Sequence, residues 1–307
     1  MERGDQMAGK NTQFEEMLAE EIRKYKGVCV PVKSSLPRRL LVWKAWLGSL
    51  HPNPEDEFCD PEIGPNYEIV AGYEQEYLRS RRGPYIREIQ NSNRYEPLTV
   101  ERMRPGGYMI LNGHHRWAAA MRAGRYRLPI RIVNLTRGED IRRILAASEH
   151  SRRATLDLDE VVFCGPGDAA DRKPAFPWNL IYKQPMRLGV PALTRFLQRR
   201  GYDVWVYSTE YHSQDEIEHY LRSHQVRVTG IVTGAARKVS KGIRKEMEAL
   251  ISGHYPETVH IDGQSVVRTR SGDKAFEEHT LSGDAESWSR EVMEVFEGFA
   301  GKAEKQP

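Results

Sequence analysis

Cysteine is scarce in this chain, and long apolar runs are absent. The three thiols, Cys29, Cys59 and Cys164, are odd in number and far apart in 307 residues. This spacing fits neither a disulfide framework nor a paired-cysteine metal site, so we expect a reducing compartment. No stretch approaches 18 consecutive apolar residues, so no membrane span is indicated. The first residues lack the apolar core of a signal peptide. We therefore expect a cytoplasmic protein without a membrane partner.

A strong excess of charge is also lacking. The net charge is +3, with 29% charged and 39% hydrophobic residues, which is an ordinary globular composition. Nucleic-acid-binding proteins usually carry a clustered basic face, so a nucleic acid is an open but not a favoured partner. The length predicts about two domains. A polar, basic stretch at residues 148–153 places the boundary near residue 150, which gives domains 1–150 and 151–307.

The sharpest signal of the first half is a strand, turn and helix at residues 111–124. A strand is expected to end at Leu111, and an alanine-rich helix to follow over residues 114–122 and stop at Gly124. A glycine turn before a helix exposes backbone N–H groups at the positive end of the helix dipole, which favours anions. We predict a phosphate or nucleotide site here, while a simple helix cap with surface histidines is the alternative. Its residues would be Asn112, Gly113, His114, His115 and Arg116.

This segment, residues 110–124 with its flanking strands, resembles the α+β fold shared by ParB partition proteins and sulfiredoxin. In that family the Gly-x-x-Arg turn and helix bind nucleotide phosphates, so the resemblance implies a nucleotide such as ATP or ADP, or another phosphorylated ligand. His114 stands where sulfiredoxin has cysteine, so sulfinic acid repair is not implied. His114 and His115 also replace the Glu-Arg of the ParB pattern. Other members of this fold are small-molecule kinases, and a metabolite kinase is therefore an open alternative.

The second half alternates short apolar strands with helices. This alternation predicts βαβ units around a parallel sheet, with ligands beyond the carboxyl ends of the strands. The expected strands are residues 155–163, 203–207, 228–232 and 258–261, and the expected helices are residues 191–200, 214–223, 241–251 and 285–299.

Polar residues follow these strands in order. Asp157 and Asp159 come first, then Ser208 with Thr209 as a second choice. A lysine-rich loop offers Lys238 or Lys241, and Asp262 follows the last strand. Each residue alone is typical of a strand end or a turn. Together they are the acids, hydroxyl and cation that metal-assisted phosphoryl transfer needs.

This order of motifs resembles the haloacid dehalogenase (HAD) superfamily over residues 155–267. The resemblance implies a Rossmannoid domain with Asp157 as nucleophile and Asp159 as general acid and base. It implies that Ser208 and Lys238 stabilise the transferring group, and that Mg²⁺ is held by Asp157, the backbone carbonyl of Asp159, and Asp262. Many members carry a second acid after the last aspartate, where this chain has Gly263 and Gln264.

We therefore predict an α/β protein with two domains. The first is a ParB/sulfiredoxin-like module, and the second is a HAD-type, Mg²⁺-dependent phosphohydrolase acting on a phosphorylated small molecule or nucleotide. The alternative of a different class is a nucleotide- or DNA-binding regulator whose HAD-like domain is a non-catalytic scaffold. The sequence names neither the substrate nor the oligomeric state.

Overall fold

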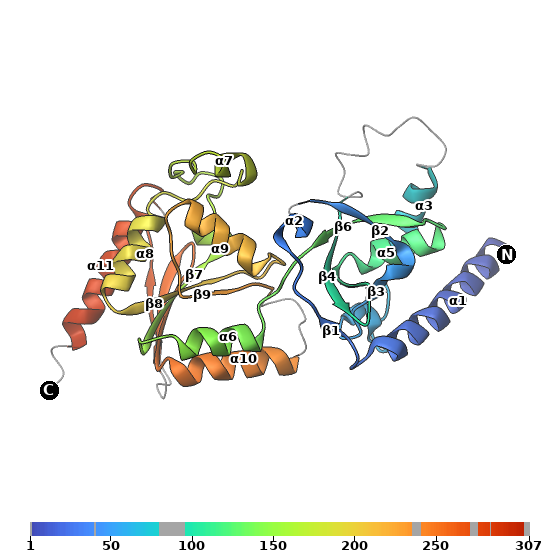
Figure 1. The fold of residues 1–307 in the computed structure, drawn as a ribbon, viewed down its shortest axis with the longest axis horizontal. Helices are drawn as coiled ribbons and strands as arrows, with labels where there is room; N and C mark the ends of the chain where they lie inside the picture. Colours follow the sequence, from blue (N-terminus) through green and yellow to red (C-terminus); the bar gives the residue numbers. More distant parts are fainter. Residues whose placement is uncertain are drawn as a thin grey trace. The chain divides into compact units, whose positions relative to one another are not determined.

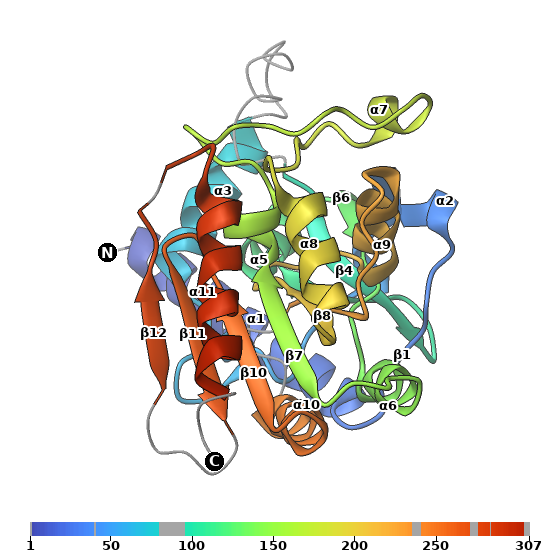
Figure 2. The same cartoon turned by 90° about the vertical axis from the view of Figure 1, so that its left-hand side faces the viewer.

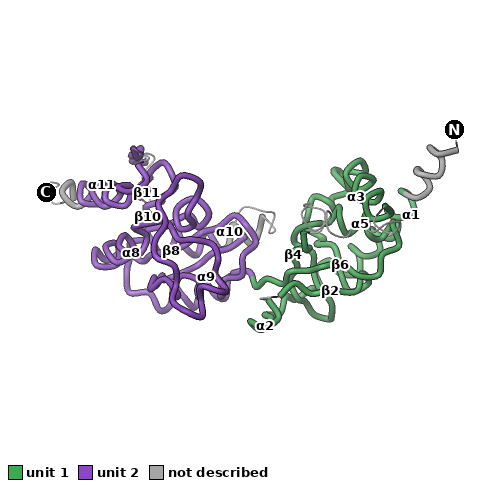
Figure 3. The backbone as a smooth tube through the Cα atoms, turned by 90° about the horizontal axis from the view of Figure 1, so that it is seen from above, with its two compact units in different colours: residues 1–134 green, residues 135–307 purple. Residues whose placement is uncertain are grey.

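The computed structural model describes the backbone of residues 2–39, 41–79, 96–234, 241–270, 276–282 and 284–303. It divides into two compact units, Met1–Asn134 and Leu135–Pro307, which are coloured separately in Figure 3. Each unit has its own mixed α/β architecture around one six-stranded sheet. No helix of the described residues is long and apolar enough to cross a membrane.

Unit 1 is an α+β unit with a sheet in the order β2-β6-β4-β5-β3, and β1 pairs with β4. The pairs β4–β6 and β3–β5 are parallel, and the others are antiparallel. Its elements are α1 (Glu2–Tyr25), β1 (Val30–Pro31), α2 (Leu36–Arg39), β2 (Trp43–Trp46), β3 (Leu50–Pro52), α3 (Tyr67–Arg79), β4 (Leu98–Arg104), β5 (Tyr108–Asn112), α5 (His114–Arg122) and β6 (Arg127–Ile132).

One face of this sheet forms the core of unit 1 with three helices. Alternate residues of the strands, such as Val100, Ile110 and Ile130, are buried with the alanine-rich face of α5. Helices α1 and α3 add Phe14 and Val70 to the same cluster. Because side chains alternate along a strand, the residues between these core positions lie on the opposite face of the sheet. The expected helix and strands around residues 108–124 are confirmed.

Unit 2 contains the predicted alternation of strands and helices (Figures 1 and 2). Its elements are α6 (Gly138–Ala146), β7 (Arg152–Asp157), a π-helical turn (Leu158–Val162), α7 (Trp178–Ile181), α8 (Val190–Arg199), β8 (Tyr202–Tyr207), α9 (Gln214–Ser223), β9 (Gly230–Val232), α10 (Lys241–His254), β10 (Glu257–Ile261), β11 (Ser265–Arg270), β12 (Glu277–Thr280) and α11 (Trp288–Ala303).

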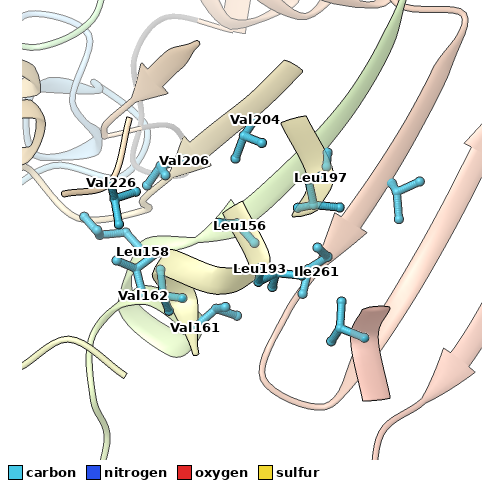
Figure 4. Close-up of a cluster of buried hydrophobic side chains, with 14 of the residues drawn as sticks. Leu156, Leu158, Val161, Val162, Leu193, Leu197, Val204, Val206, Val226 and Ile261 are labelled. Carbon is cyan, nitrogen blue, oxygen red and sulfur yellow. The ribbon is translucent and has the colours of Figure 1, made fainter. Parts of the chain in front are cut away.

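The sheet order is β12-β11-β10-β7-β8-β9, and its four strands β10, β7, β8 and β9 are parallel as predicted. Helices α8, α9 and α11 cover one face around fully buried Leu156 and Val206 (Figure 4). Helices α6 and α10 cover the other face, where Ile141 packs with Trp205 and Ile251. Strands β11 and β12 extend the sheet in antiparallel fashion, which the sequence reading did not anticipate.

The division between the units differs from the expected boundary near residue 150. The first unit ends at Asn134, so α6 belongs to the second unit. The physical reason is packing, because Ile141 of α6 is fully buried in the cluster around Trp205. Thr136 also donates a hydrogen bond of 2.9 Å to the carbonyl of Ile231. The polar stretch after α6 is therefore a connection within unit 2.

Candidate functional site

The carboxyl ends of three neighbouring parallel strands place predicted site residues together. Asp157 is in register with Tyr207 of β8, and Ile261 of β10 is in register with Leu156. Asp262, which comes directly after Ile261, therefore lies at the level of Asp157 in the neighbouring strand. Ser208, which comes directly after Tyr207, lies on the opposite side of β7. Neighbouring strands lie about 4.8 Å apart. The structure thus brings Asp157, Ser208 and Asp262 to one edge of the sheet.

The first aspartate is held at the point where β7 becomes a π-helical turn. The expected strand over residues 155–163 is too long, because it ends at Asp157. One oxygen of Asp157, Oδ1, accepts hydrogen bonds of 2.8 Å from the backbone N–H groups of Asp159 and Glu160. These bonds cap the turn and orient the carboxylate. Burial raises the pKa of Asp157 above its ordinary value, although the two N–H groups act to lower it.

Asp159 lies in the turn and not on the strand, and its carboxylate faces two side chains after β8. Oδ2 accepts a hydrogen bond of 2.7 Å from the buried Ser208 hydroxyl, and Oδ1 lies 3.3 Å from Nε2 of His212. Burial acts to raise the pKa of Asp159, but the hydrogen bonds from His212 and Ser208 outweigh it and lower the pKa. The sequence reading missed His212, which follows no strand motif. The sequence signal that could have identified His212 is its position four residues after Ser208, in the same loop.

Asp262 directly follows β10 and closes a tight turn into β11. Its Oδ1 accepts hydrogen bonds from the backbone N–H groups of Gln264 and Ser265, at 2.8 and 2.6 Å. Its Oδ2 lies 3.1 Å from the Ser265 hydroxyl. The carboxylate therefore has a structural role in the turn.

The predicted cation cannot be placed. Lys238 lies outside the described residues, and Lys241 begins helix α10 with a side chain that is also outside them. The choice between the two lysines stays a prediction. Thr209, the second choice for the hydroxyl, is exposed, whereas Ser208 is 1% exposed.

Among the described side chains, no group of three or more His, Cys, Asp or Glu residues is arranged to hold a metal ion. The predicted ligand from Asp159 is its backbone carbonyl, so the hydrogen bonds of the Asp159 side chain to Ser208 and His212 do not occupy a metal ligand. Mg²⁺ in phosphoryl-transfer sites needs only one or two carboxylates with water and substrate oxygens. Asp157 and Asp262, at the ends of neighbouring strands, match that number of carboxylates.

The predicted phosphate turn of unit 1 has the expected backbone. Gly113 has φ 102°, in the left-handed region that favours glycine, and it precedes α5 as the N-cap residue. An added Cβ would lie 2.4 Å from Leu98 and 3.0 Å from the Arg116 guanidinium. Asn112 is the last residue of β5.

The side chains of this turn are engaged within unit 1. His114, 4% exposed, accepts a hydrogen bond from the N–H of Asn53 and stacks on Phe58. His115 accepts one from the N–H of Asn66. The two histidines thus fix both ends of the proline-rich loop at residues 53–66.

Arg116 is buried and donates to the backbone carbonyl of Glu96, with the Glu96 carboxylate 3.7 Å away. In this arrangement its guanidinium supports the fold and does not face an open phosphate site. The backbone N–H groups remain the anion-binding feature of the turn. The helix N-cap has no side-chain hydrogen bond, and of the two histidines expected at the surface His114 is buried and His115 is half-buried. The phosphate site stays a prediction.

Comparisons with known proteins support one half of the sequence prediction. Residues 86–149 match the family model of the ParB N-terminal domain. A similar solved structure is the C-terminally truncated chromosome-partitioning protein ParB from Caulobacter crescentus, complexed to the centromeric parS site. It is 23% identical with a TM-score of 0.20, and the match covers 34% of this chain and 46% of that chain. The chain thus spans less than half of that ParB structure.

No curated protein matches this chain. None of these findings supports the resemblance of residues 155–267 to the HAD superfamily, which stays a prediction. The chain therefore contains a ParB-like segment that includes β4, β5, α5, β6 and α6.

Proposed function

We propose that this chain is a ParB-like regulator that binds a nucleotide or DNA through unit 1. The observation that carries the proposal is the match of residues 86–149 to the ParB N-terminal domain. The matched segment contains the turn at Gly113 and the N-terminus of α5, where backbone N–H groups and the helix dipole favour a phosphate. His114, His115 and Arg116 hold the surrounding loop and strand in place for that backbone contact.

Unit 2 serves as a scaffold in this proposal. The carboxylates of Asp157, Asp159 and Asp262 all accept hydrogen bonds from their own chain, which gives each acid a structural role. Such capped strand ends are sufficient to explain acids in these positions.

Ligand-induced stabilisation tests the proposal. The full chain is heated with each nucleoside triphosphate and with duplex DNA, and hydrogen exchange is followed at residues 112–117. We expect a higher Tm and slower exchange at this turn with one of these ligands, because a ligand bound only to the folded state stabilises it. The Asp157→Asn variant should respond in the same way. No stabilisation by any nucleotide or DNA would overturn the proposal.

A second candidate function is phosphoryl transfer in unit 2, and one specific observation favours it. The strand register brings Asp157, Ser208 and Asp262 to one edge of a parallel sheet, where ligands of such sheets bind. Two N–H groups fix Oδ1 of Asp157, and Oδ2 accepts no hydrogen bond within the described residues. That oxygen is the candidate nucleophile.

In this reaction Oδ2 of Asp157 attacks phosphorus while the bond to the leaving oxygen breaks, which gives an aspartyl-phosphate. Asp159 donates its proton to the leaving oxygen. It then accepts a proton from a water molecule that attacks the phosphorus and releases Asp157 and inorganic phosphate. Asp157 and Asp262 would hold Mg²⁺, which would neutralise charge on the phosphoryl oxygens.

Phosphate release from a panel of phosphorylated metabolites with Mg²⁺ tests this second candidate. Asp157→Asn should abolish release, because an amide oxygen is a poor nucleophile. Asp171→Asn is the matched control, since Asp171 lies in the following loop and its Oδ1 accepts only a local hydrogen bond from Arg172. Equal rates in wild type and Asp157→Asn would exclude the reaction.

A further inference from the structure

Two long segments of unit 1 contain no acidic residue. Residues 22–54 hold seven Lys or Arg and residues 102–138 hold eight, with no Asp or Glu in either, although the chain has 43 acids in total. The edge strand β2 comes from the first segment, and its neighbour β6 comes from the second. The fold therefore pairs two acid-free segments side by side.

The face of β2 and β6 opposite the core is basic and aromatic. Ala45, Leu128 and Ile130 point into the core, so the residues between them point outward. These outward residues are Lys44, Trp46, Arg127, Pro129 and Arg131, and the three cations among them are exposed.

The exposed aromatic ring of this outward face is Trp46, which is 57% exposed. Trp43, 44% exposed, is two residues from core-facing Ala45 and lies on the other face, and Tyr126, 74% exposed, precedes β6. Trp46 is in register with Arg127, whose guanidinium lies 4.0 Å from the indole centroid. The N–H of Leu47 donates a hydrogen bond to the carbonyl of Tyr126, which continues the pairing of the two segments beyond Trp46 and Arg127.

No acid of the described residues forms an ion pair with Lys44, Arg127 or Arg131, so these charges are not neutralised within that part of the protein. Arg127 and Arg131 are four residues apart on one strand, which is about 13 Å at 3.3 Å per residue. The cations thus form a row along β6, with the indole of Trp46 at one end.

We propose that this outward face of β2 and β6 binds single-stranded nucleic acid, with Lys44, Arg127 and Arg131 on phosphates and Trp46 stacked on a base. A row of cations selects a polyanion, and an exposed ring selects one whose bases are unpaired and free to stack. Duplex DNA hides the faces of its bases, so it would use the cations but not the ring. This inference goes beyond the nucleotide site at α5 and does not depend on it.

Fluorescence anisotropy of a labelled oligothymidylate of about 16 nucleotides tests the proposal on the full chain. We expect binding that weakens with salt, with a slope of log K against log salt of about −2 for three neutralised phosphates. Arg127→Gln should make this slope less steep by about 0.7. Trp46→Ala should weaken binding roughly 5- to 150-fold, as expected for one lost base stack.

Two exposed residues of unit 2 provide matched controls. Trp178→Ala and Arg172→Gln remove an indole and a cation from another surface, and both should leave binding unchanged. Trp46 is exposed, so Trp46→Ala is expected to fold. Nucleotide-induced stabilisation should persist in Trp46→Ala and Arg127→Gln, which separates this face from the α5 site. Undetectable binding, tighter binding to a duplex of the same length, or equal losses in the control variants would overturn the proposal.

Discussion

Replacing Ser208 with alanine probes the contact that joins β8 to the turn after β7. The hydroxyl donates a hydrogen bond of 2.7 Å to Oδ2 of Asp159 and accepts one of 3.0 Å from the N–H of Glu210. Ser208 is 1% exposed, so water does not readily replace these bonds. Ser208→Ala therefore removes two hydrogen bonds and leaves the Glu210 N–H without this partner.

The expected loss in the free energy of unfolding follows from the two bonds. A hydrogen bond to a charged group contributes about 1.5–3 kcal/mol, and a neutral one about 0.5–1.5 kcal/mol. The Asp159 side chain is 31% exposed, so solvent compensates part of the first term. We expect a loss of about 2 kcal/mol at neutral pH.

The stability loss caused by Ser208→Ala should depend on pH. Against the effect of burial, His212 and Ser208 hold the pKa of Asp159 below its ordinary value of 3.8. A lowered carboxyl pKa stabilises the fold above the ordinary pKa, and this stability is lost as pH falls through the folded-state pKa. Ser208→Ala removes part of this lowering. The difference between wild type and variant should be largest at neutral pH and should narrow below a pH of about 4.

Urea unfolding at a series of pH values measures this difference. A double-mutant cycle with Asp159→Asn isolates the Ser208–Asp159 coupling, which we expect to be about 1–2 kcal/mol. A coupling near zero, or a destabilisation independent of pH, would show that the serine hydroxyl does not hold the Asp159 carboxylate.

Three further substitutions test the supporting structure. Gly113→Ala should destabilise unit 1 by about 1–2 kcal/mol or more, because alanine is strained at positive φ and its Cβ would meet Leu98; calorimetry of the full chain should show a lower Tm. Leu156→Ala should cost about 2–5 kcal/mol in urea unfolding, since the side chain is fully buried in the core of unit 2. Gly230→Ala should destabilise β9, because a Cβ there would lie 2.4 Å from the buried Trp205 ring; slower-exchanging amides in β9 of the variant than of wild type would contradict this.

Much of the second unit could be read from the sequence because its strands are short apolar runs separated by clear helices. The order Asp157, Ser208 and Asp262 at strand ends follows from that alternation and from the parallel sheet. The end of β7 was less predictable. The apolar run continues through Val161 and Val162, which are buried in the π-helical turn as they would be in a strand.

The side-chain roles in unit 1 could not be read from the sequence. His114 and His115 appear as donors for a phosphate, yet their ring nitrogens accept hydrogen bonds from the backbone of residues 53 and 66. Those contacts join residues that are 61 and 49 positions apart, and no local pattern specifies them. The basic face of β2 and β6 was hidden for a similar reason. The overall charge of +3 averages it with acids elsewhere in the chain.

Asp159 is the residue at which the two proposed roles of unit 2 differ most. As a scaffold residue it needs only to remain ionised, and the lowered pKa produced by Ser208 and His212 serves that role. As a general acid it must carry a proton before the leaving oxygen departs. A phosphoryl dianion beside Asp157 and Asp159 would raise the pKa of Asp159 by like-charge repulsion. Catalysis in this unit therefore requires that the substrate itself create the protonated acid, whereas the free protein keeps Asp159 as a base.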